Sequence, residues 1–456
     1  MRDRPGDGAD TGPAASGLQT PAASCPTAPR TATAAPGTQD RHRRLQTWLD
    51  ALPEGAADAV LMAPADAARY SAQWQAIEGA WTDPLSDVVG DPEAVRGAIE
   101  DRMRWLDAQV QAGTYVEGVA GDFARALSVV GSAEAIDEVR VMADEAPLFC
   151  APLSTGLFKS PIDPDFDRNR CASLHPGELV RVARHDTQTD WWRVHAGHTA
   201  GWVHAPTWTP ALSREETAQR YGRTVSARTD AATTDGGMPI RLGVRLPVLG
   251  EGERAGTVRV SVPTAEGWAE DTVAVGGDVL EPATVPVTRR AVWAAALSEL
   301  DAPYGWGGRA GERDCSRLLR DVFASFGVQL PRHSGVQALV GTRNVDVSAM
   351  SEADKRDEIR RAAARGLVLL YMPGHIMLYL GEDGPNMYAV SSVSEFLTPC
   401  EGGPDTVHRL DRVAVTTLDI GRGTERTAFI ERITRLVLFE PGAAPSDAAP
   451  TSPTSQ

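Results

Sequence analysis

The spacing of apolar residues divides the chain into regions of different period. Between residues 41 and 135 the apolar positions follow helical spacing. They form three stripes: Leu45, Trp48, Leu49 and Leu52; Ile99, Met103, Leu106 and Val110; and Phe123, Leu127 and Val130. Residues at i, i+3, i+4 and i+7 share one face of a helix. The region 41–135 therefore predicts an α-helical N-terminal domain, or an extended helical collar, that carries no chemistry of its own.

Between residues 136 and 212 the period changes to two. Apolar and polar residues alternate from Leu179 to Arg184, and Trp-rich segments follow at 191–194 and 201–203. Short alternating segments separated by turns predict a small β-barrel. An insertion at 154–174, rich in Pro and Asp, interrupts this barrel. Residues 213–286 repeat the same order of segments and predict a second barrel.

The region 287–440 combines both periods. A helix containing Val292 and Trp293 leads into a glycine-rich loop that starts at Tyr304. A second helix begins near Cys315, with one apolar stripe comprising Leu318, Leu319, Val322, Phe323 and Phe326. Strands are predicted at 367–372, 375–381, 387–393 and 434–439. Helices followed by an antiparallel sheet make this region an α+β domain.

The two ends of the chain have a different composition. Residues 1–40 and 441–456 are rich in small and polar residues and in proline, with almost no large apolar side chains. Such segments bury too little surface to offset the entropy of ordering. We expect a disordered tether at 1–40 and a disordered tail at 441–456. Cys25, within the tether, has no evident partner.

Composition and charge narrow the class of protein. A chain of 456 residues predicts about three or four domains. A net charge of −16 argues against nucleic acid and anionic membranes as partners. No run approaches the roughly 18 apolar residues of a membrane span. Cys150 and Cys171 flank the insertion and are candidates for a disulfide in an oxidising compartment, although spacing alone does not place them together.

Cys315 is the candidate nucleophile. The predicted helix starts at this residue, so its thiol lies near unpaired backbone N–H groups and the positive end of the helix dipole. Both favour the thiolate, and we expect the pKa of Cys315 to be lowered. A thiol activated in this way is a nucleophile.

His375 is the candidate general base. Pro373-Gly374 predicts a tight hairpin between two apolar strands, and His375 opens the second strand. A cysteine on a helix packed against a histidine on a strand is the arrangement of papain-like enzymes. His333 is a less favoured alternative base, because we interpret both His333 and Arg332 as structural residues.

Four ordered segments resemble the NlpC/P60 cell-wall cysteine peptidases. These segments are Tyr304-Gly305-Trp306-Gly307-Gly308, Asp314-Cys315-Ser316, 330–334 and 374–381. The family usually places a histidine on the next strand to orient the catalytic imidazole, but here that strand, 387–393, has none. Alternation makes Ser391 the best candidate for this position and Ser392 the second. A serine accepts the ring N–H but brings no charge, so we expect a slower enzyme.

The resemblance also implies roles for other residues. Tyr304 would donate toward the oxyanion, together with the backbone N–H of Cys315 or Ser316. Trp306 and the two glycines that follow it would shape the pocket floor. Asp314 and Ser316 would hold the free α-amino group of L-Ala in a stem peptide. The ends of the two barrels resemble bacterial SH3 domains, and the first would form a wall of the cleft through Trp191 or Trp192.

The implied activity is hydrolysis of the amide after the γ-D-glutamyl residue of a peptidoglycan stem peptide, through a thioester and without a cofactor. The first alternative is a cell-wall binding protein whose chemistry is impaired by the missing histidine. A second is an acyltransferase on the same Cys-His pair, but no apolar acyl-binding patch is evident. The barrel histidines match no metal-ligand signature, and we expect scattered surface residues: His175, His185, His195, His198 and His204.

The sequence leaves two possibilities for the cellular location of the protein. The opening residues lack the pattern of a signal peptide. The protein is then cytoplasmic, or the numbering describes a mature or truncated chain. The implied function favours the second reading, with a location in the cell envelope or periplasm. We expect a monomer.

Overall fold

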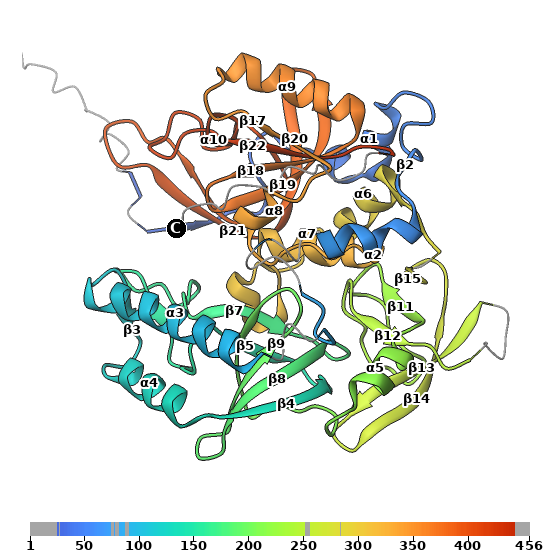
Figure 1. Ribbon diagram of the computed structural model, residues 1–456. Helices are drawn as coiled ribbons and strands as arrows, with labels where there is room; N and C mark the ends of the chain where they lie inside the picture. The colour runs from blue at the N-terminus through green and yellow to red at the C-terminus, as the bar shows by residue number, and fades with distance from the viewer. Residues whose placement is uncertain are drawn as a thin grey trace, which may run out of the picture.

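The computed structural model describes residues 25–26, 28–73, 77, 82–86, 91–250, 256–282 and 284–442. Most of the predicted tether and tail, at 1–24 and 443–456, lies outside these residues. Figure 1 shows three units that contain β-sheet: a C-terminal α+β unit and two smaller β-domains on one side of it. The helix α7 (Cys315–Ala324) lies where the three units meet.

The C-terminal unit is built on a seven-stranded sheet of order β1-β21-β20-β19-β18-β22-β17. The strands are β1 (Arg30–Thr31), β17 (Arg343–Asp346), β18 (Leu367–Met372), β19 (His375–Asp383), β20 (Asn386–Thr398), β21 (Thr406–Thr417) and β22 (Arg435–Phe439). All neighbours are antiparallel except β1 and β21. The predicted strands at 367–372, 375–381, 387–393 and 434–439 are present. Strands β17 and β21 were not predicted.

Helices cover both faces of this sheet. On one face α6 (Arg289–Ser298) and α7 pack against residues such as Leu367 and Leu369. On the other face α9 (Glu352–Arg365) and α10 (Phe429–Arg432) pack against Val368 and Leu370. Successive residues of β18 point to opposite faces, so the apolar run of this strand is buried on both sides.

The first β-domain is a six-stranded sheet of order β4-β8-β9-β10-β5-β7. Its strands are β4 (Glu134–Val141), β5 (Ala146–Phe149), β7 (Arg170–Leu174), β8 (Leu179–Asp186), β9 (Trp191–His195) and β10 (Ala200–His204). Val180 and Val182 point into its core, as their alternation predicts. A disulfide joins Cys150 to Cys171 at the ends of the insertion. Within the insertion, β6 (Leu157–Phe158) pairs with β3 (Val116–Glu117).

The second β-domain follows α5 (Arg214–Arg220) and has a core of its own. A three-stranded sheet of order β12-β11-β15 is formed by β11 (Thr224–Ala227), β12 (Arg245–Pro247) and β15 (Val279–Leu280). A hairpin of β13 (Thr257–Thr264) and β14 (Gly267–Ala274) completes the domain. The SH3-like character of both β-domains stays a prediction.

The region 41–135 does not form the predicted independent helical domain. Helices α1 (Leu45–Asp50) and α2 (Pro64–Gln73) belong to the C-terminal unit, where Trp48 and Tyr70 enter its core. Between them, β2 (Val60–Met62) pairs with β16 (Val287–Thr288). In contrast, α3 (Pro92–Gln111) and α4 (Asp122–Ser132) cover the first β-domain. The two pairs of helices share no core with each other, because each pair buries its apolar face against a different sheet.

The predicted apolar stripe on α4, comprising Phe123, Leu127 and Val130, is not the face that the helix buries. On α4 the buried residues are Phe123, Ala126 and Val129, whereas Leu127 is 41% exposed. The small side chain of Ala126 allows the helix to lie close to the first β-domain, and this rotates Leu127 into solvent. Spacing alone does not distinguish these two faces.

The predicted tether is ordered at its C-terminal end. Cys25 forms a disulfide with Cys400, and β1 pairs with β21 through Arg30 and His408. A short 3₁₀-helix at Asp40–Arg43 then leads into α1. The expectation that Cys25 has no partner is therefore wrong. Its partner lies 375 residues away in the sequence, and local composition does not predict a contact over such a separation.

Candidate active site

Cys315 is the first residue of α7 and is a free cysteine, 7% exposed. The side chain of Asp314 caps this helix by accepting a hydrogen bond from the backbone N–H of Arg317. The backbone N–H groups of Ile376 and Ser316 donate to the Cys315 sulfur. The nucleophile helix and the histidine strand β19 therefore meet at this thiol.

The expected lowering of the thiol pKa is wrong. Burial raises the pKa of Cys315 to about 12, and the negative charge of Asp314 adds to the rise. The two backbone donors and Arg332 act in the opposite direction but do not offset it. The sequence placed Cys315 correctly at a helix start, but the dipole argument left out the desolvation of the thiolate. In the resting protein the thiol is protonated.

His375 lies at the start of β19, half-buried beside Phe429. Its Nε2 atom is 3.1 Å from the hydroxyl oxygen of Ser391. Burial lowers the pKa of His375 to about 4, and the nearby Arg432 contributes to the same effect. The ring is then neutral, as a general base must be. Within the described residues no hydrogen bond joins the ring to the Cys315 sulfur, as is common in ligand-free active sites.

The two candidate serines on β20 have different partners. Ser391 faces His375, on the side of the sheet that alternation predicted. Ser392 points the other way, and its hydroxyl donates to the backbone carbonyl of Arg313 at 2.7 Å. Ser391 is thus the serine that contacts the imidazole, while Ser392 helps to fix the chain just before Cys315.

Tyr304 lies close to the nucleophile. Burial raises its pKa, and the negative charge of Asp314 adds to the rise, so the phenol keeps its proton. A protonated hydroxyl is able to donate a hydrogen bond. Its ring also packs near Phe166 of the insertion, with centroids 6.2 Å apart.

Trp306 contacts the first β-domain. Its indole N–H donates to the carbonyl of Asp167 at 2.9 Å, and the guanidinium of Arg168 lies 4.3 Å from its ring centroid. Gly307 and Gly308, both with positive φ, lie in the 3₁₀ segment η4 (Trp306–Gly311). A Cβ atom on them would lie 2.6 Å from the Arg170 backbone and 2.4 Å from that of Ser173. These glycines allow two domains to approach each other.

The predicted wall residues Trp191 and Trp192 lie elsewhere. Trp191 is buried beneath α3 and α4, where it packs against Phe149. Trp192 stacks on His185 and contacts Trp208 on the opposite face of the strand. The first β-domain does adjoin the site, but it does so through the insertion and β7, which contact η4.

Asp314 is already paired in this structure. Both of its carboxylate oxygens accept hydrogen bonds from Arg332, at 3.0 and 2.6 Å. The Ser316 hydroxyl and the Gly307 backbone N–H also donate to it. Arg332, predicted to be structural, thus neutralises the carboxylate expected to bind the substrate amine. Any substrate ammonium would have to share Asp314 with Arg332.

A buried charge network surrounds α7 and was not predicted. Arg313 forms two hydrogen bonds of 2.7 Å with Asp230 of the second β-domain. It also contacts Asp321 at 2.8 Å and Glu299 at 3.3 Å. On the next turn Arg317 pairs with Asp321 and with Glu178 of the first β-domain. Charged residues on α7 and just before it therefore join all three units.

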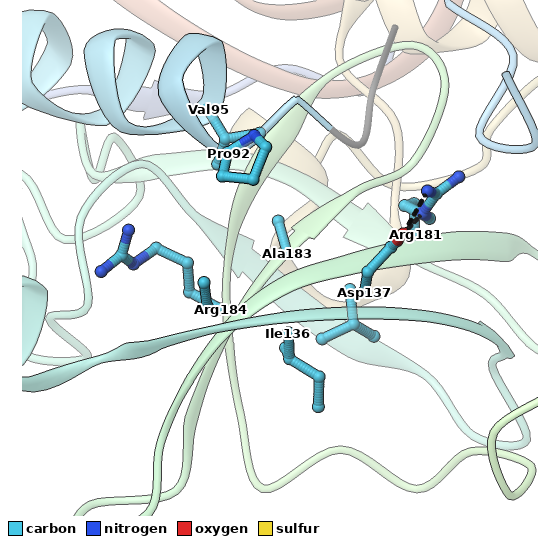
Figure 2. Close-up of a pocket in the computed structure, with 9 residues that line it drawn as sticks. Pro92, Val95, Ile136, Asp137, Arg181, Ala183 and Arg184 are labelled. Carbon is cyan, nitrogen blue, oxygen red and sulfur yellow. Dashed lines mark hydrogen bonds and ion pairs between the residues drawn. The ribbon is translucent and has the colours of Figure 1, made fainter. Parts of the chain in front are cut away.

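Two of the five histidines of the first β-domain do not lie at its surface. His175 and His198 are fully buried, since desolvation is tolerated when the rings stay neutral. Among the described residues, no group of three or more His, Cys, Asp or Glu residues is arranged to hold a metal. A cavity of ≈ 200 Å³ between the start of α3 and strands β4 and β8 contains none of the predicted site residues (Figure 2). No helix in the described ranges is long and apolar enough to cross a membrane.

Comparison with known protein families also selects the region that contains the candidate active site. The family model described as NlpC/P60 matches residues 301–395. A search of curated protein sequences found no match. Among solved structures, an NlpC/P60 endopeptidase from Photobacterium damselae subsp. piscicida is similar, with a TM-score of 0.68 and 16% identity; the match covers 91% of this chain and 100% of that one.

Two further structures have lower scores. An NlpC/P60 family protein from Bacillus cereus has a TM-score of 0.43 and 18% identity, covering 66% of this chain and 100% of that one. The peptidoglycan hydrolase RipB from Mycobacterium tuberculosis has a TM-score of 0.17 and 26% identity, covering 28% and 60%. Only the first similarity describes the whole fold. The family match includes Cys315, His375 and Ser391, and we conclude that this chain contains an NlpC/P60 domain, matched at residues 301–395.

Proposed function

We propose that the protein hydrolyses the amide bond between γ-D-glutamate and the diamino acid of a peptidoglycan stem peptide. The observation that carries this proposal is the arrangement at the start of α7. A free cysteine there receives backbone hydrogen bonds, including one from the residue that follows His375, and the imidazole is held by Ser391. Cys315 is the nucleophile, His375 the general base, and Ser391 the residue that orients the base.

The protonation states support a concerted first step. Because the thiol is protonated and the imidazole is neutral, the proton passes from Cys315 to His375 as sulfur attacks the γ-carbonyl carbon. The ring nitrogen available is Nδ1, since Nε2 faces Ser391. Tyr304 donates to the developing oxyanion. His375 then gives the proton to the departing amine, which leaves a γ-glutamyl thioester on Cys315.

Water completes the reaction. His375, neutral again, takes a proton from the water molecule that attacks the thioester carbonyl. The C–S bond breaks and Cys315 recovers its proton through His375. No cofactor takes part in this sequence. Two disulfides, Cys25–Cys400 and Cys150–Cys171, support a location outside the cytoplasm, in the cell envelope or periplasm.

A second candidate function is favoured by one observation. The residue beside the His375 ring is an uncharged serine, Ser391. Burial raises the pKa of the Cys315 thiol to about 12. Both would suit a stem-peptide binding protein with impaired chemistry. Incubation with L-Ala-γ-D-Glu-diaminopimelate distinguishes the two functions, because an enzyme releases L-Ala-D-Glu, whereas a binding protein returns the intact peptide.

Replacement of Ser391 tests the proposed imidazole partner. Ser391→Val removes the oxygen that holds Nε2, so kcat should fall by about 10- to 100-fold, as for other residues that orient a catalytic ligand. Ser391→His restores a second imidazole and should keep or raise kcat. In the wild type, kcat/KM should rise with pH through about 4, where the His375 ring loses its proton, and then remain level.

The matched control for this series is Ser392→Val, because the Ser392 hydroxyl donates to the Arg313 carbonyl and not to the His375 ring. It should leave the acid limb of the pH profile in place. An unchanged kcat in Ser391→Val would contradict the assignment of Ser391, and a wild-type acid limb near the ordinary histidine value of about 6.5 would contradict the lowered pKa of His375.

The proposal also includes a preference for short stems with a free N-terminal L-Ala, held by Asp314 and Ser316. Because Arg332 shares this carboxylate, the preference should be modest. We expect kcat/KM for the free tripeptide to exceed that for its N-acetylated form by about 10-fold, as for one charge-assisted hydrogen bond. Equal values for both peptides would remove the amine-binding role of Asp314 and Ser316.

A further inference from the structure

Tyr371, on β18, lies beside the nucleophile and has no part in the mechanism proposed above. It is paired with Ile376 of β19, whose backbone N–H donates to the Cys315 sulfur. Directly opposite residues of antiparallel strands have Cβ atoms about 5 Å apart and share one face of the sheet. Tyr371 and Ile376 both pack against the core cluster that includes Cys315. The phenol therefore lies on the same side of the sheet as the nucleophile.

The Tyr371 hydroxyl is available to a ligand. The residue is half-buried, and within the described residues its hydroxyl has no hydrogen-bond partner. The ring reaches the short helix α8 (Ser334–Gln337), where a Cβ atom on Gly335 would lie 3.5 Å from the hydroxyl oxygen. Burial raises the pKa of Tyr371, so the phenol keeps its proton at neutral pH. A hydrogen-bond donor without a protein acceptor thus lies at the edge of the site.

The next strand adds a positive charge to this row. On its other side Tyr371 is paired with Arg435, the first residue of β22. Val437 and Phe439 of the same strand belong to the core cluster of Cys315. Alternation therefore places the half-buried Arg435 side chain on this face as well. The nucleophile, a phenol and a guanidinium follow one another across the neighbouring strands β19, β18 and β22 (Figure 1).

Arg435 has no acidic partner in the part of the chain that the structure describes. Its neighbour on the outer strand β17 is Asp346, directly opposite in the register. The Asp346 carboxylate accepts hydrogen bonds from the backbone N–H and the hydroxyl of Ser348, at 2.9 and 2.6 Å, rather than from Arg435. Among the described residues the Arg435 side chain makes neither an ion pair nor a hydrogen bond. Its N–H donors therefore remain available to a ligand.

The catalytic pair has two different sides. Tyr304 lies on the side of β21, where its backbone N–H donates to the carbonyl of Asp411 at 3.0 Å, and its ring packs near the insertion of the first β-domain. Tyr371 and Arg435 lie on the other side, because the sheet order is β21-β20-β19-β18-β22. In the proposed function Asp314, which accepts from the backbone of the loop after Tyr304, holds the N-terminal half of the stem. The departing amine is then on the side of β18 and β22.

We infer that Tyr371 and Arg435 bind the leaving diamino acid. Tyr371 donates to its α-carboxylate, next to the scissile bond, and Arg435, one strand or about 5 Å farther out, binds a carboxylate at the end of its side chain. The identity of the peptide rests on the proposed function. Guanidinium groups bind carboxylates through directed, charge-assisted hydrogen bonds. Diaminopimelate has such a terminal carboxylate, whereas lysine ends in an ammonium group that Arg435 would repel.

Calorimetric binding to the full-length Cys315→Ala protein tests this inference without turnover. Two tripeptides are compared: L-Ala-γ-D-Glu-diaminopimelate and L-Ala-γ-D-Glu-L-Lys, which lacks the terminal carboxylate. Adding Arg435→Gln should raise the Kd for the diaminopimelate peptide by about 10- to 100-fold, the effect of losing a hydrogen bond to a charged group. The Kd for the lysine peptide should stay the same or fall. Adding Tyr371→Phe should raise both Kd values by about 10-fold, because both peptides have the α-carboxylate.

Arg343→Gln is the matched control. Arg343 lies on β17 at the same edge of the sheet, but it is paired with Leu438, which belongs to the core cluster of the opposite face. This variant should leave both Kd values unchanged. Arg435→Lys keeps the charge and should weaken binding of the diaminopimelate peptide less than Arg435→Gln does. Thermal melting checks the fold of each variant.

The outcomes separate this inference from the proposed function. Equal Kd values in the parent and Arg435→Gln proteins, or no binding of either tripeptide, overturn the inference. So does an equal rise for both peptides, because the effect would then not depend on the terminal carboxylate. If the predicted Kd pattern is found but the Cys315-containing protein releases no diaminopimelate, the binding site stands and the proposed hydrolysis fails. If that protein cleaves the peptide but Arg435→Gln binds it as the parent does, the proposed hydrolysis stands and the inference fails.

Discussion

Cys315→Ala should fold as the wild type does and release no product from a stem tripeptide. The substitution removes one sulfur atom from the start of α7, so the free energy of unfolding should change by about 1 kcal/mol or less. Activity should fall by a factor on the order of 10⁴ or more, as for the loss of other catalytic nucleophiles. Thermal melting and chromatographic product analysis measure the two effects on the same sample.

Ser316→Ala serves as the comparison, because it changes the next residue, which lies within the same hydrogen-bonded cluster around Asp314. It should retain measurable hydrolysis. If Cys315→Ala still cleaves the tripeptide at the wild-type rate, the thiol is not the nucleophile and the proposed mechanism is wrong.

Arg313→Met should be the most destabilising single change near the site. Arg313 is the hydrogen-bonding partner of Asp230, Glu299 and Asp321, and its side chain is 2% exposed. Without it, these carboxylates remain in a buried site with less compensating charge. Breaking a buried ion pair in this way costs about 3–5 kcal/mol. Chemical denaturation should show this loss, whereas Arg290→Met, which removes the exposed pair with Asp58, should change the stability little.

The pH dependence of stability gives an independent measurement of the same network. Burial raises the pKa of Asp230, but Arg313 more than offsets this effect and lowers it to about 2. A carboxylate with a lowered pKa stabilises the fold above its unfolded value of about 3.8 and loses this contribution as the pH falls toward 2. Arg313→Met should lack this part of the acid-dependent loss. A variant as stable as the wild type, with the same acid dependence, would show that Arg313 does not join the units.

The positions of Cys315 and His375 in the fold could be predicted because their signals are local. The apolar stripe after Cys315 fixes the start of α7, and Pro373-Gly374 fixes the hairpin that precedes His375. Ser391 followed from strand alternation, since every second residue of β20 shares a face. Each of these inferences needed only residues within one helix or one hairpin.

The remaining errors concern contacts between distant segments. Trp306 meets Asp167, which is 139 residues away, and Cys25 meets Cys400. No local spacing encodes such pairs. The thiol pKa was misjudged for a related reason, because the desolvation of Cys315 comes from protein packed around it from several segments. Local sequence therefore predicted the chemistry of the site better than its surroundings.

The most direct test of the central claim is to incubate the full chain with L-Ala-γ-D-Glu-diaminopimelate and identify the products by mass spectrometry. We predict equal amounts of L-Ala-D-Glu and free diaminopimelate, and neither product from Cys315→Ala. Intact peptide after prolonged incubation with the wild type, or cleavage between L-Ala and D-Glu instead, would contradict the proposed function.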